Sequence, residues 1–184
     1  MFGGLSFCPV PGIYKVMDAK TKFETLYRTR YDDVFYFVLR RIGSGGDSVA
    51  RAEEVTAEAF TAIWCNLDKV PDHPDEAKAW LFGVARNCLL HEQRSSLRRA
   101  ALAVKVTGDA AGPGIAPDDQ AVHNLDFNRA WHQLTATDQE ALALAAFEDL
   151  PASQAAKVLG INAGAYKFRL HSARKKLHKL LNQE

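Results

Sequence analysis

Basic side chains gather near the end of the chain, where they could bind a polyanion. The stretch 162–181 contains Lys167, Arg169, Arg174, Lys175, Lys176 and Lys179. Lys and Arg donate hydrogen bonds to phosphate oxygens and to the edges of guanine bases. The stretch is therefore a candidate nucleic-acid contact. The alternative is an ordinary basic surface helix, whose cations stabilise the C-terminal end of the helix dipole.

The segment around these cations has the pattern of a helix-turn-helix. Leu150-Pro151 begins a short helical segment, Gly160 ends it, and Asn162 is a good N-cap for a longer helix. The recognition helix of such a motif lies in the major groove of duplex DNA. The turn, the spacing and the charge therefore all favour DNA binding.

Helical periodicity assigns a direction to each side chain of the longer helix. An inward stripe consists of Tyr166, Leu170, Ala173 and Leu177. Lys167, His171 and Arg174 then lie together on one flank of the helix, beside the stripe. Arg169 lies on the other flank, and Phe168 faces outward. These outward residues are the ones that a DNA groove would meet.

Two smaller charged groups occur in the first half of the chain. Arg94, Arg98 and Arg99 close a predicted third helix, while Glu53, Glu54 and Glu58 lie near the start of a second one. The whole chain of 184 residues has 23 Lys and Arg against 22 Asp and Glu, a net charge of +1. That balance excludes a uniform polycation, so any nucleic-acid contact must be local.

Strong helical signals define the first half of the chain. Thr21 and Glu24 have the spacing of a capping box, and an apolar stripe then runs to Ile42. A second helix is expected over 48–67, burying Val55, Ala59, Ile63 and Leu67. After Pro71 and Pro74, a third helix should bury Trp80, Leu81, Val84, Ala85, Cys88 and Leu89.

The second half follows a change in composition. Residues 101–121 hold several Gly and Pro among alanines and are expected to be a flexible linker. Helical periodicity resumes near 122, and Thr137 with Glu140 again has capping-box spacing. No strand-like alternation of any length occurs. The sequence therefore predicts an all-α fold, with small helical domains over 20–100 and 122–184.

Several classes of protein are disfavoured by what the sequence contains. Residues 1–19 lack the features of a secretory signal, so they are expected to be a disordered tail or to follow a start codon placed too early. No apolar run is long enough to span a membrane. Three cysteines without close pairing, Cys8, Cys65 and Cys88, favour a reducing cytoplasm over a disulfide framework.

No catalytic or metal-binding constellation is evident. The six histidines are scattered, and no zinc-protease, nucleophile-elbow or P-loop pattern occurs. Cys88 and His91 stand three apart on one helix, but no second pair accompanies them. We therefore expect no enzymatic activity, no cofactor and no metal.

The sequence resembles the extracytoplasmic-function sigma factors of bacterial RNA polymerase. The stretch 164–174, GAYKFRLHSAR, resembles their promoter-recognition helix. The stretches 54–64, EVTAEAFTAIW, and 79–87, AWLFGVARN, resemble their second conserved region, as do Leu26-Tyr27-Arg28 and Val34-Phe35. The resemblance covers about 20–182 and implies a region 2-like helical bundle and a region 4-like helix-turn-helix.

The resemblance implies a role for each half. The first domain would dock on a coiled coil of the polymerase β′ subunit and read the −10 element as single strands. The second would lie near the β flap and read the −35 element as duplex. The family commonly has anti-sigma factors, so such a partner is expected too. The protein would direct promoter-specific initiation as a cytoplasmic factor that is monomeric when free.

Particular residues match the positions of these roles. Glu54 and Glu58 match acidic positions on the β′-docking helix; the alternative is a solvated helix start that favours the dipole. Arg86, Asn87, Arg94 and Arg98 are the expected −10 contacts, although Asn87 could instead be a buried, bonded helix residue. The expected −35 contacts are Asn162, Lys167, Phe168, Arg169, His171, Arg174 and Lys175.

Some positions depart from the family pattern. Ala57 replaces a polar residue on the docking helix, which is expected to weaken docking there. Phe168 could contact a thymine methyl and so make the −35 sequence atypical, or it could equally bury against a regulator. Gly83 lies in mid-helix at a cost of about 1 kcal/mol relative to Ala. The −10 region offers only Trp80 and Phe82 for base stacking, which predicts stringent promoter choice.

The main competing interpretation is a helix-turn-helix regulator that is not a sigma factor. Its N-terminal helices would dimerise or bind a ligand, and it would bind palindromic duplex DNA without polymerase. A third interpretation is an interaction protein that retains the β′ face but does not start transcription. The regulator interpretation explains 122–184 but ignores the detailed match of 26–100.

Overall fold

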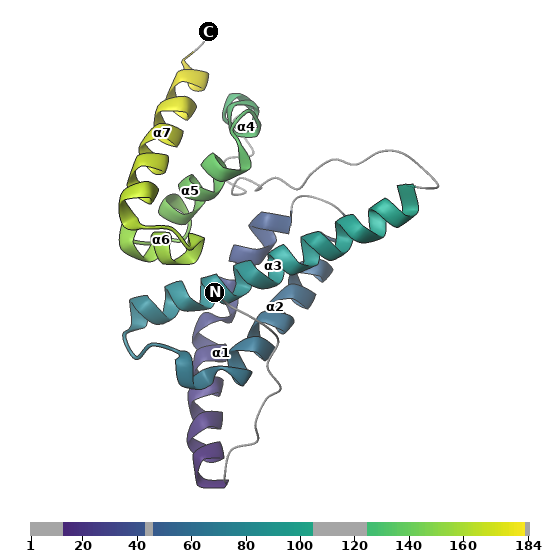
Figure 1. Ribbon diagram of the computed structural model, residues 1–184, viewed down its shortest axis with the longest axis vertical. Coiled ribbons are helices and arrows are strands. Elements are labelled where there is room, and N and C mark those ends of the chain that lie inside the picture. The colour runs from purple at the N-terminus through teal and green to yellow at the C-terminus, as the bar shows by residue number, and fades with distance from the viewer. Residues whose placement is uncertain (1–12, 43–45, 105–124, 183–184) are drawn as a thin grey trace.

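The computed structural model describes residues 13–42, 46–104 and 125–182. All regular structure within these ranges is helical: seven α-helices and one short 3-10 helix, η1. Figure 1 shows α1, α2 and α3 as one group and α4 to α7 as another, packed against the first. The predicted all-α class is therefore confirmed. No helix of the described chain is long and apolar enough to cross a membrane.

The first group is built on two long helices. Helix α1 spans Ile13–Ile42, α2 spans Ser48–Cys65, η1 spans Leu67–Lys69 and α3 spans Pro74–Val104. All four residues expected to be buried on the second helix are buried: Val55, Ala59, Ile63 and Leu67. On α3 the expected stripe is present too, with Leu81, Ala85, Cys88 and Leu89 buried and Trp80 and Val84 half-buried.

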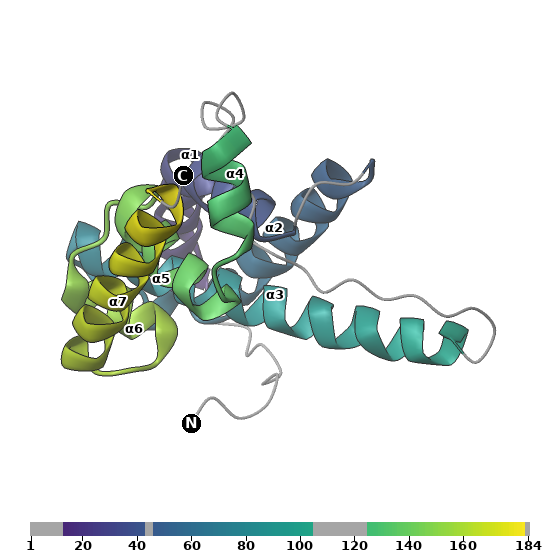
Figure 2. The same ribbon diagram turned by 90° about the horizontal axis from the view of Figure 1, so that it is seen from above.

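The second group contains four shorter helices. They are α4 (Leu125–His132), α5 (Ala136–Ala146), α6 (Ala152–Leu159) and α7 (Ala163–Leu181). Helix α6 ends at Gly160, whose φ of 67° is left-handed and favours glycine. Figure 2 shows α3 extending away from both groups at its C-terminal end.

Two predicted helix starts are wrong. Helix α1 begins at Ile13, so Thr21 lies inside it, and its first turns fall within the expected tail, 1–19. Helix α5 begins one residue after Thr135, whose hydroxyl accepts a hydrogen bond from the Asp138 amide at 3.2 Å. Thr135 rather than Thr137 is therefore the N-cap. Residues 1–12 and 105–121 of the expected tail and linker lie outside the described residues.

Candidate nucleic-acid and polymerase interfaces

Helix α7 is held rigidly by its first two turns. Asn162 caps it, because its Oδ1 accepts a hydrogen bond from the Ala165 amide at 2.7 Å. Tyr166 is fully buried, and its hydroxyl donates to the Ala141 carbonyl at 3.0 Å. The predicted inward stripe is therefore confirmed, with Ala173 also fully buried. The opposite face of α7 is left to solvent.

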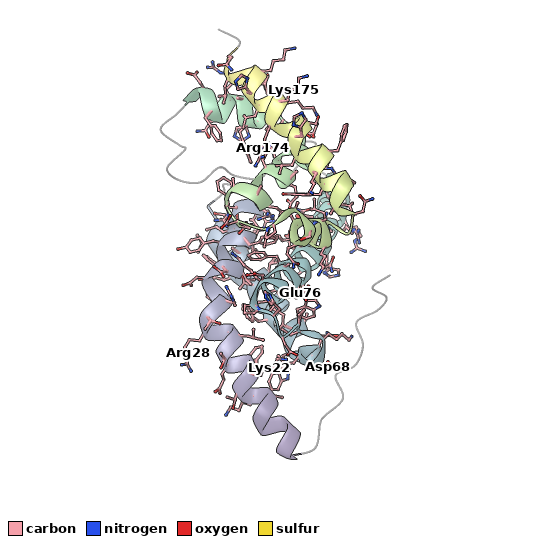
Figure 3. All side chains as sticks on the ribbon, turned by 90° about the vertical axis from the view of Figure 1, so that its left-hand side faces the viewer. Lys22, Arg28, Asp68, Glu76, Arg174 and Lys175 are labelled. Carbon is pink, nitrogen blue, oxygen red and sulfur yellow. The ribbon has the colours of Figure 1, made fainter. Side chains whose placement is uncertain are left out.

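That opposite face carries most of the expected −35 contacts. The exposed residues among them are Asn162, Lys167, Phe168, His171, Arg174 and Lys175. Phe168 is 78% exposed, which is unusual for so large an apolar side chain. None of the basic residues in this set forms an ion pair within the described part of the chain. Figure 3 shows Arg174 and Lys175 on α7, far from Lys22 and Arg28 on α1.

Two basic residues of α7 face α5 instead. Lys176 Nζ lies 2.6 Å from the Asp138 carboxylate, which is buried at the start of α5. Arg169 is half-buried, and its charge also acts on Asp138. Burial alone would raise the pKa of Asp138, but the bonds from Lys176 and Thr135 and the two positive charges lower it. Arg169 is therefore the least available of the expected −35 contacts.

The expected −10 contacts lie along one side of α3. Asn87, Arg94 and Arg98 are exposed, and Arg86 is half-buried. The Arg98 Nε donates to the backbone carbonyl of Arg94 at 3.2 Å, and the spacing of four residues places Arg94 and Arg98 on one face of α3. Asn87 is thus a surface residue, and the alternative of a buried, bonded Asn87 is excluded.

The two aromatic side chains expected near this surface differ in exposure. Phe82 is fully buried and stacks on Phe37, with 4.6 Å between ring centroids, so it is not available to a base. Trp80 is half-buried against the core. Gly83 lies beside them, and a Cβ added there would meet nothing within 4 Å. Close packing within the chain therefore does not explain this glycine.

The acidic residues that α2 offers to a partner are exposed. Glu54 and Glu58 both face solvent, and Glu58 Oε1 lies 3.8 Å from His91 Nδ1. Cys88 is nearby, and burial, followed by the charge of Glu58, raises the pKa of its thiol to about 12. Cys88 is therefore protonated at neutral pH. Within the described ranges, no three His, Cys, Asp or Glu residues could hold a metal ion.

A buried charge cluster joins the two groups of helices. The Glu148 carboxylate lies 2.9 Å from Arg40 Nη2 and 3.1 Å from Arg41 Nη1. Arg41 Nε also lies 3.1 Å from Glu140 Oε1. Arg41 and Glu148 are only 4% and 2% exposed. The contact thus removes several charges from water.

Apolar side chains surround this cluster. Leu144, Leu150, Ala155 and Val158 belong to the same hydrophobic cluster as Phe37 and Phe82 of the first group. Lys78 Nζ donates to the Glu148 carbonyl at 3.0 Å, and Lys157 pairs with Glu76 at 2.9 Å near the edge. Sequence reasoning did not identify the residues of this contact. Its one local signal is Arg41, a charge within the apolar stripe of α1.

Comparison with known families matches both halves of the chain. Residues 26–99 match the family described as "Sigma-70 region 2". Residues 125–177 match the family described as "Sigma-70, region 4". The first range contains α2 and most of α3, and the second contains α5 and the helix-turn-helix. Each group of helices therefore corresponds to one of the two matched regions.

Comparison with curated proteins gives relatives over nearly the whole chain. The chain is 30% identical over 176 residues to "ECF RNA polymerase sigma factor SigL" of Mycobacterium tuberculosis, covering 92% of this chain and 96% of the relative. It is 27% identical over 162 residues to "ECF RNA polymerase sigma factor BldN" of Streptomyces coelicolor, covering 86% and 60%.

Solved structures share the fold. The sigma factor RpoE of Bartonella quintana, solved with the anti-sigma factor NepR, has a TM-score of 0.65 at 22% identity and covers 89% of this chain and 99% of that one. CnrH, solved with the cytosolic domain of CnrY, has a TM-score of 0.57 at 22% identity and covers 90% and 96%. At these identities the likeness is one of fold.

Proposed function

Because the chain belongs to the extracytoplasmic-function sigma factors of RNA polymerase, we propose which of its surfaces carries each step of promoter recognition. The protein binds core polymerase and promoter DNA and directs promoter-specific initiation. The chemistry of nucleotide addition belongs to the polymerase, so this chain is proposed to have no catalytic activity. Its proposed place of action is the cytoplasm, where polymerase and promoters are found.

The exposed face of α7 is proposed to read the −35 element as duplex. Its support is a set of basic side chains that have no ion-pair partner among the described residues, on a helix whose other face is fixed by Tyr166 and Ala173. Lys167, His171 and Arg174 would face base edges and phosphates, and Phe168 would face a thymine methyl. Asn162, Arg169 and Lys175 would complete the contact, Arg169 with the smallest share.

The exposed side of α3 is proposed to hold the −10 element as single strands. Asn87 would bond a displaced base, and Arg86, Arg94 and Arg98 would hold phosphates. Since Phe82 is buried, few stacking platforms remain, so specific capture of a base must supply most of the discrimination. We therefore expect low tolerance of scrambled −10 sequences.

Helix α2 is proposed to dock on the β′ coiled coil through Glu54 and Glu58, while the helix-turn-helix domain lies near the β flap. Exposed acidic side chains suit a basic partner, and charges at the rim of an interface chiefly set its on-rate and specificity. The domain limits proposed for these roles are 20–100 and 122–184.

The contact between the domains is proposed to open when both elements are read. Two promoter elements about two helical turns apart are separated by roughly 70 Å. A compact chain of this length has a radius of gyration of about 16 Å, which makes it roughly 40 Å across. A linker of about 20 residues extends to roughly 70 Å at most. Separated domains on an extended linker therefore span the distance.

An anti-sigma factor is the further proposed partner. The two solved neighbours described above were each obtained with a binding partner, one of them named an anti-sigma factor. A regulator could hold the chain closed, with the two domains in contact. The exposed Phe168 on α7 is an apolar side chain that such a regulator could bury. When free of partners, the protein is proposed to be a monomer.

Run-off transcription tests the proposal as a whole. Purified core polymerase with this protein and a genomic fragment library should yield discrete transcripts, and core alone should not. The triple variant K167A/H171A/R174A should lose those transcripts but keep its affinity for core. Binding of palindromic duplex by the protein alone, as a dimer without affinity for core, would instead support the helix-turn-helix regulator.

A further inference from the structure

An open groove lies between α1 and α2. It has a volume of about 550 Å³ and is lined by Phe23, Tyr27, Tyr31, Glu53, Ala57, Phe60, Thr61 and Trp64. Tyr27 and Trp64 are 45% and 38% exposed, although both are large aromatic residues. Exposed aromatic side chains gathered in one place mark interaction surfaces more often than isolated ones do.

The walls of this groove are already in place. The Phe23 and Trp64 rings meet edge to face at 5.1 Å between centroids, and Tyr27 meets Phe60 in the same way at 4.8 Å. Aromatic pairs with this geometry stabilise each other beyond their burial. A ligand would therefore enter the groove without first ordering its walls, which lowers the cost of binding.

Ala57 is the smallest side chain in the lining. It is exposed on α2, one turn after Glu53 and one turn before Thr61. A long side chain at this position would reach across the mouth of the groove. Alanine leaves that space open, next to the rings of Tyr27 and Phe60.

The rim next to Ala57 is acidic. Glu53 and Glu54 are exposed and form no ion pair within the part of the chain that the structure describes. Among the described residues, the ion-pair partner of Glu58 is His91, at 3.8 Å. An apolar gap beside unpaired carboxylates fits an apolar side chain that has Lys or Arg around it on a helix.

We propose that the groove beside Ala57 receives an apolar side chain from a basic helix of core polymerase, which inserts as Glu54 and Glu58 dock. This inference rests on the docking role proposed above for α2. It also reverses the expectation that Ala57 weakens docking, because the small side chain makes room for an anchor. The acidic rim would set the rate of association with core polymerase. The groove would set the rate of dissociation and so the lifetime of the complex.

The test is filling the groove in the full-length protein. Ala57→Gln should weaken equilibrium binding to purified core polymerase at least tenfold, mostly through faster dissociation. Ala50→Gln is the matched control, since Ala50 is exposed two turns earlier on the same helix and also neighbours Glu53 and Glu54, but lies outside the groove lining. The control should bind like wild type. Circular dichroism should show equal helicity in both variants.

A second variant separates this inference from the docking role itself. The double substitution E54Q/E58Q should slow association with core. If it weakens binding while Ala57→Gln does not, the groove has no role and only the rim docks polymerase. If neither variant weakens binding, the docking role of α2 is wrong. If Ala57→Gln leaves core binding intact but abolishes self-association in sedimentation, the occupant is a second copy of this chain and the inference is overturned.

Discussion

The helix-turn-helix domain presents two surfaces of opposite character. The side that meets α1 and α3 has paired charges: Glu148 is buried with Arg40 and Arg41, and Lys157 pairs with Glu76 at the exposed edge. The exposed side of α7 carries the same kinds of cation without partners in the described chain. The comparison separates cations that hold the fold together from cations that are available to a ligand.

The paired side also carries an energetic cost. Arg40 Nε and Arg41 Nη2 are buried with no hydrogen-bond partner among the described residues. Buried ion pairs regain their desolvation cost only when every polar atom is bonded. When the domains separate, these groups return to water. An incompletely bonded cluster therefore makes the contact easier to open than an apolar contact of the same area.

The largest expected effect comes from removing the shared acid of this cluster. Glu148→Gln removes the carboxylate of Arg40 and leaves Arg41 with Glu140 alone, at a cost of up to about 3–5 kcal/mol. Because the domains can separate and hydrate both arginines, we expect the contact to open while the helices remain folded. Small-angle X-ray scattering should show a larger radius of gyration at unchanged helicity.

A neighbouring acid is the matched control for this experiment. Asp149 is exposed, and Asn tolerates its φ of 48°, so Asp149→Asn changes the charge equally without touching the cluster. It should leave the radius of gyration unchanged. Equal expansion in both variants would mean that net charge, and not the buried cluster, holds the domains together.

The exposed surface gives the next largest effect. Arg174→Ala should weaken binding of the holoenzyme to its promoter by about 1–3 kcal/mol, roughly fivefold to 150-fold. Arg169→Ala should cost less, because Arg169 is half-buried near Asp138. Fluorescence anisotropy with intact and scrambled −35 sequences measures the loss of promoter affinity in both variants.

Arg129→Ala, which removes an exposed arginine of α4, should have no effect on promoter affinity. A larger loss for Arg169 than for Arg174 would contradict the assignment.

The sequence predicts those features that local pattern decides. The apolar spacing of Val55, Ala59 and Ile63 on α2 is sufficient because each residue meets its neighbours on one helix face. The N-cap of α5 shows the limit of such reasoning. Thr135 with Asp138 and Thr137 with Glu140 have the same spacing, and capping preference alone does not choose between them.

The domain contact lies beyond local pattern. Arg41 pairs with Glu140 and Glu148, which are 99 and 107 positions away. Many acidic residues occur at comparable distances, so spacing does not identify the partners. The groove also depends on two separate segments, because Ala57 of α2 lines it only when α1 brings Tyr27 to the same place. Features that depend on two distant segments require the folded chain.

Asp138 tests whether Lys176 belongs to the fold and not to the DNA surface. Asp138→Asn should destabilise the protein by about 1 kcal/mol at pH 7, because the hydrogen bond from Lys176 loses its charged acceptor. The pKa of Asp138 is lowered in the folded state, so its contribution is present above its unfolded pKa and disappears as pH falls through the folded value. Urea titrations should therefore differ between variant and wild type at pH 7 and converge under strongly acidic conditions.

An exposed acid controls for the change in charge. Asp126→Asn in α4 removes a carboxylate that is 64% exposed and should alter stability little at either pH. If Lys176→Ala weakens promoter binding as much as Arg174→Ala does, Lys176 belongs to the DNA surface. Its assignment to the cations that hold the fold together would then be wrong.

Gly83 gives the smallest effect and extends the comparison to α3. A Cβ at this position meets nothing within 4 Å, so Gly83→Ala should stabilise the fold by about 0.5–1 kcal/mol through lower backbone entropy in the unfolded chain. Thermal unfolding measures this gain. Gly160→Ala, at a φ of 67°, should instead destabilise the fold.

Gly83 lies one turn before Asn87, so we expect the added methyl to hinder single strands held on this face. Promoter opening should then fall while stability rises; a rise in both would mean that DNA stays away from Gly83.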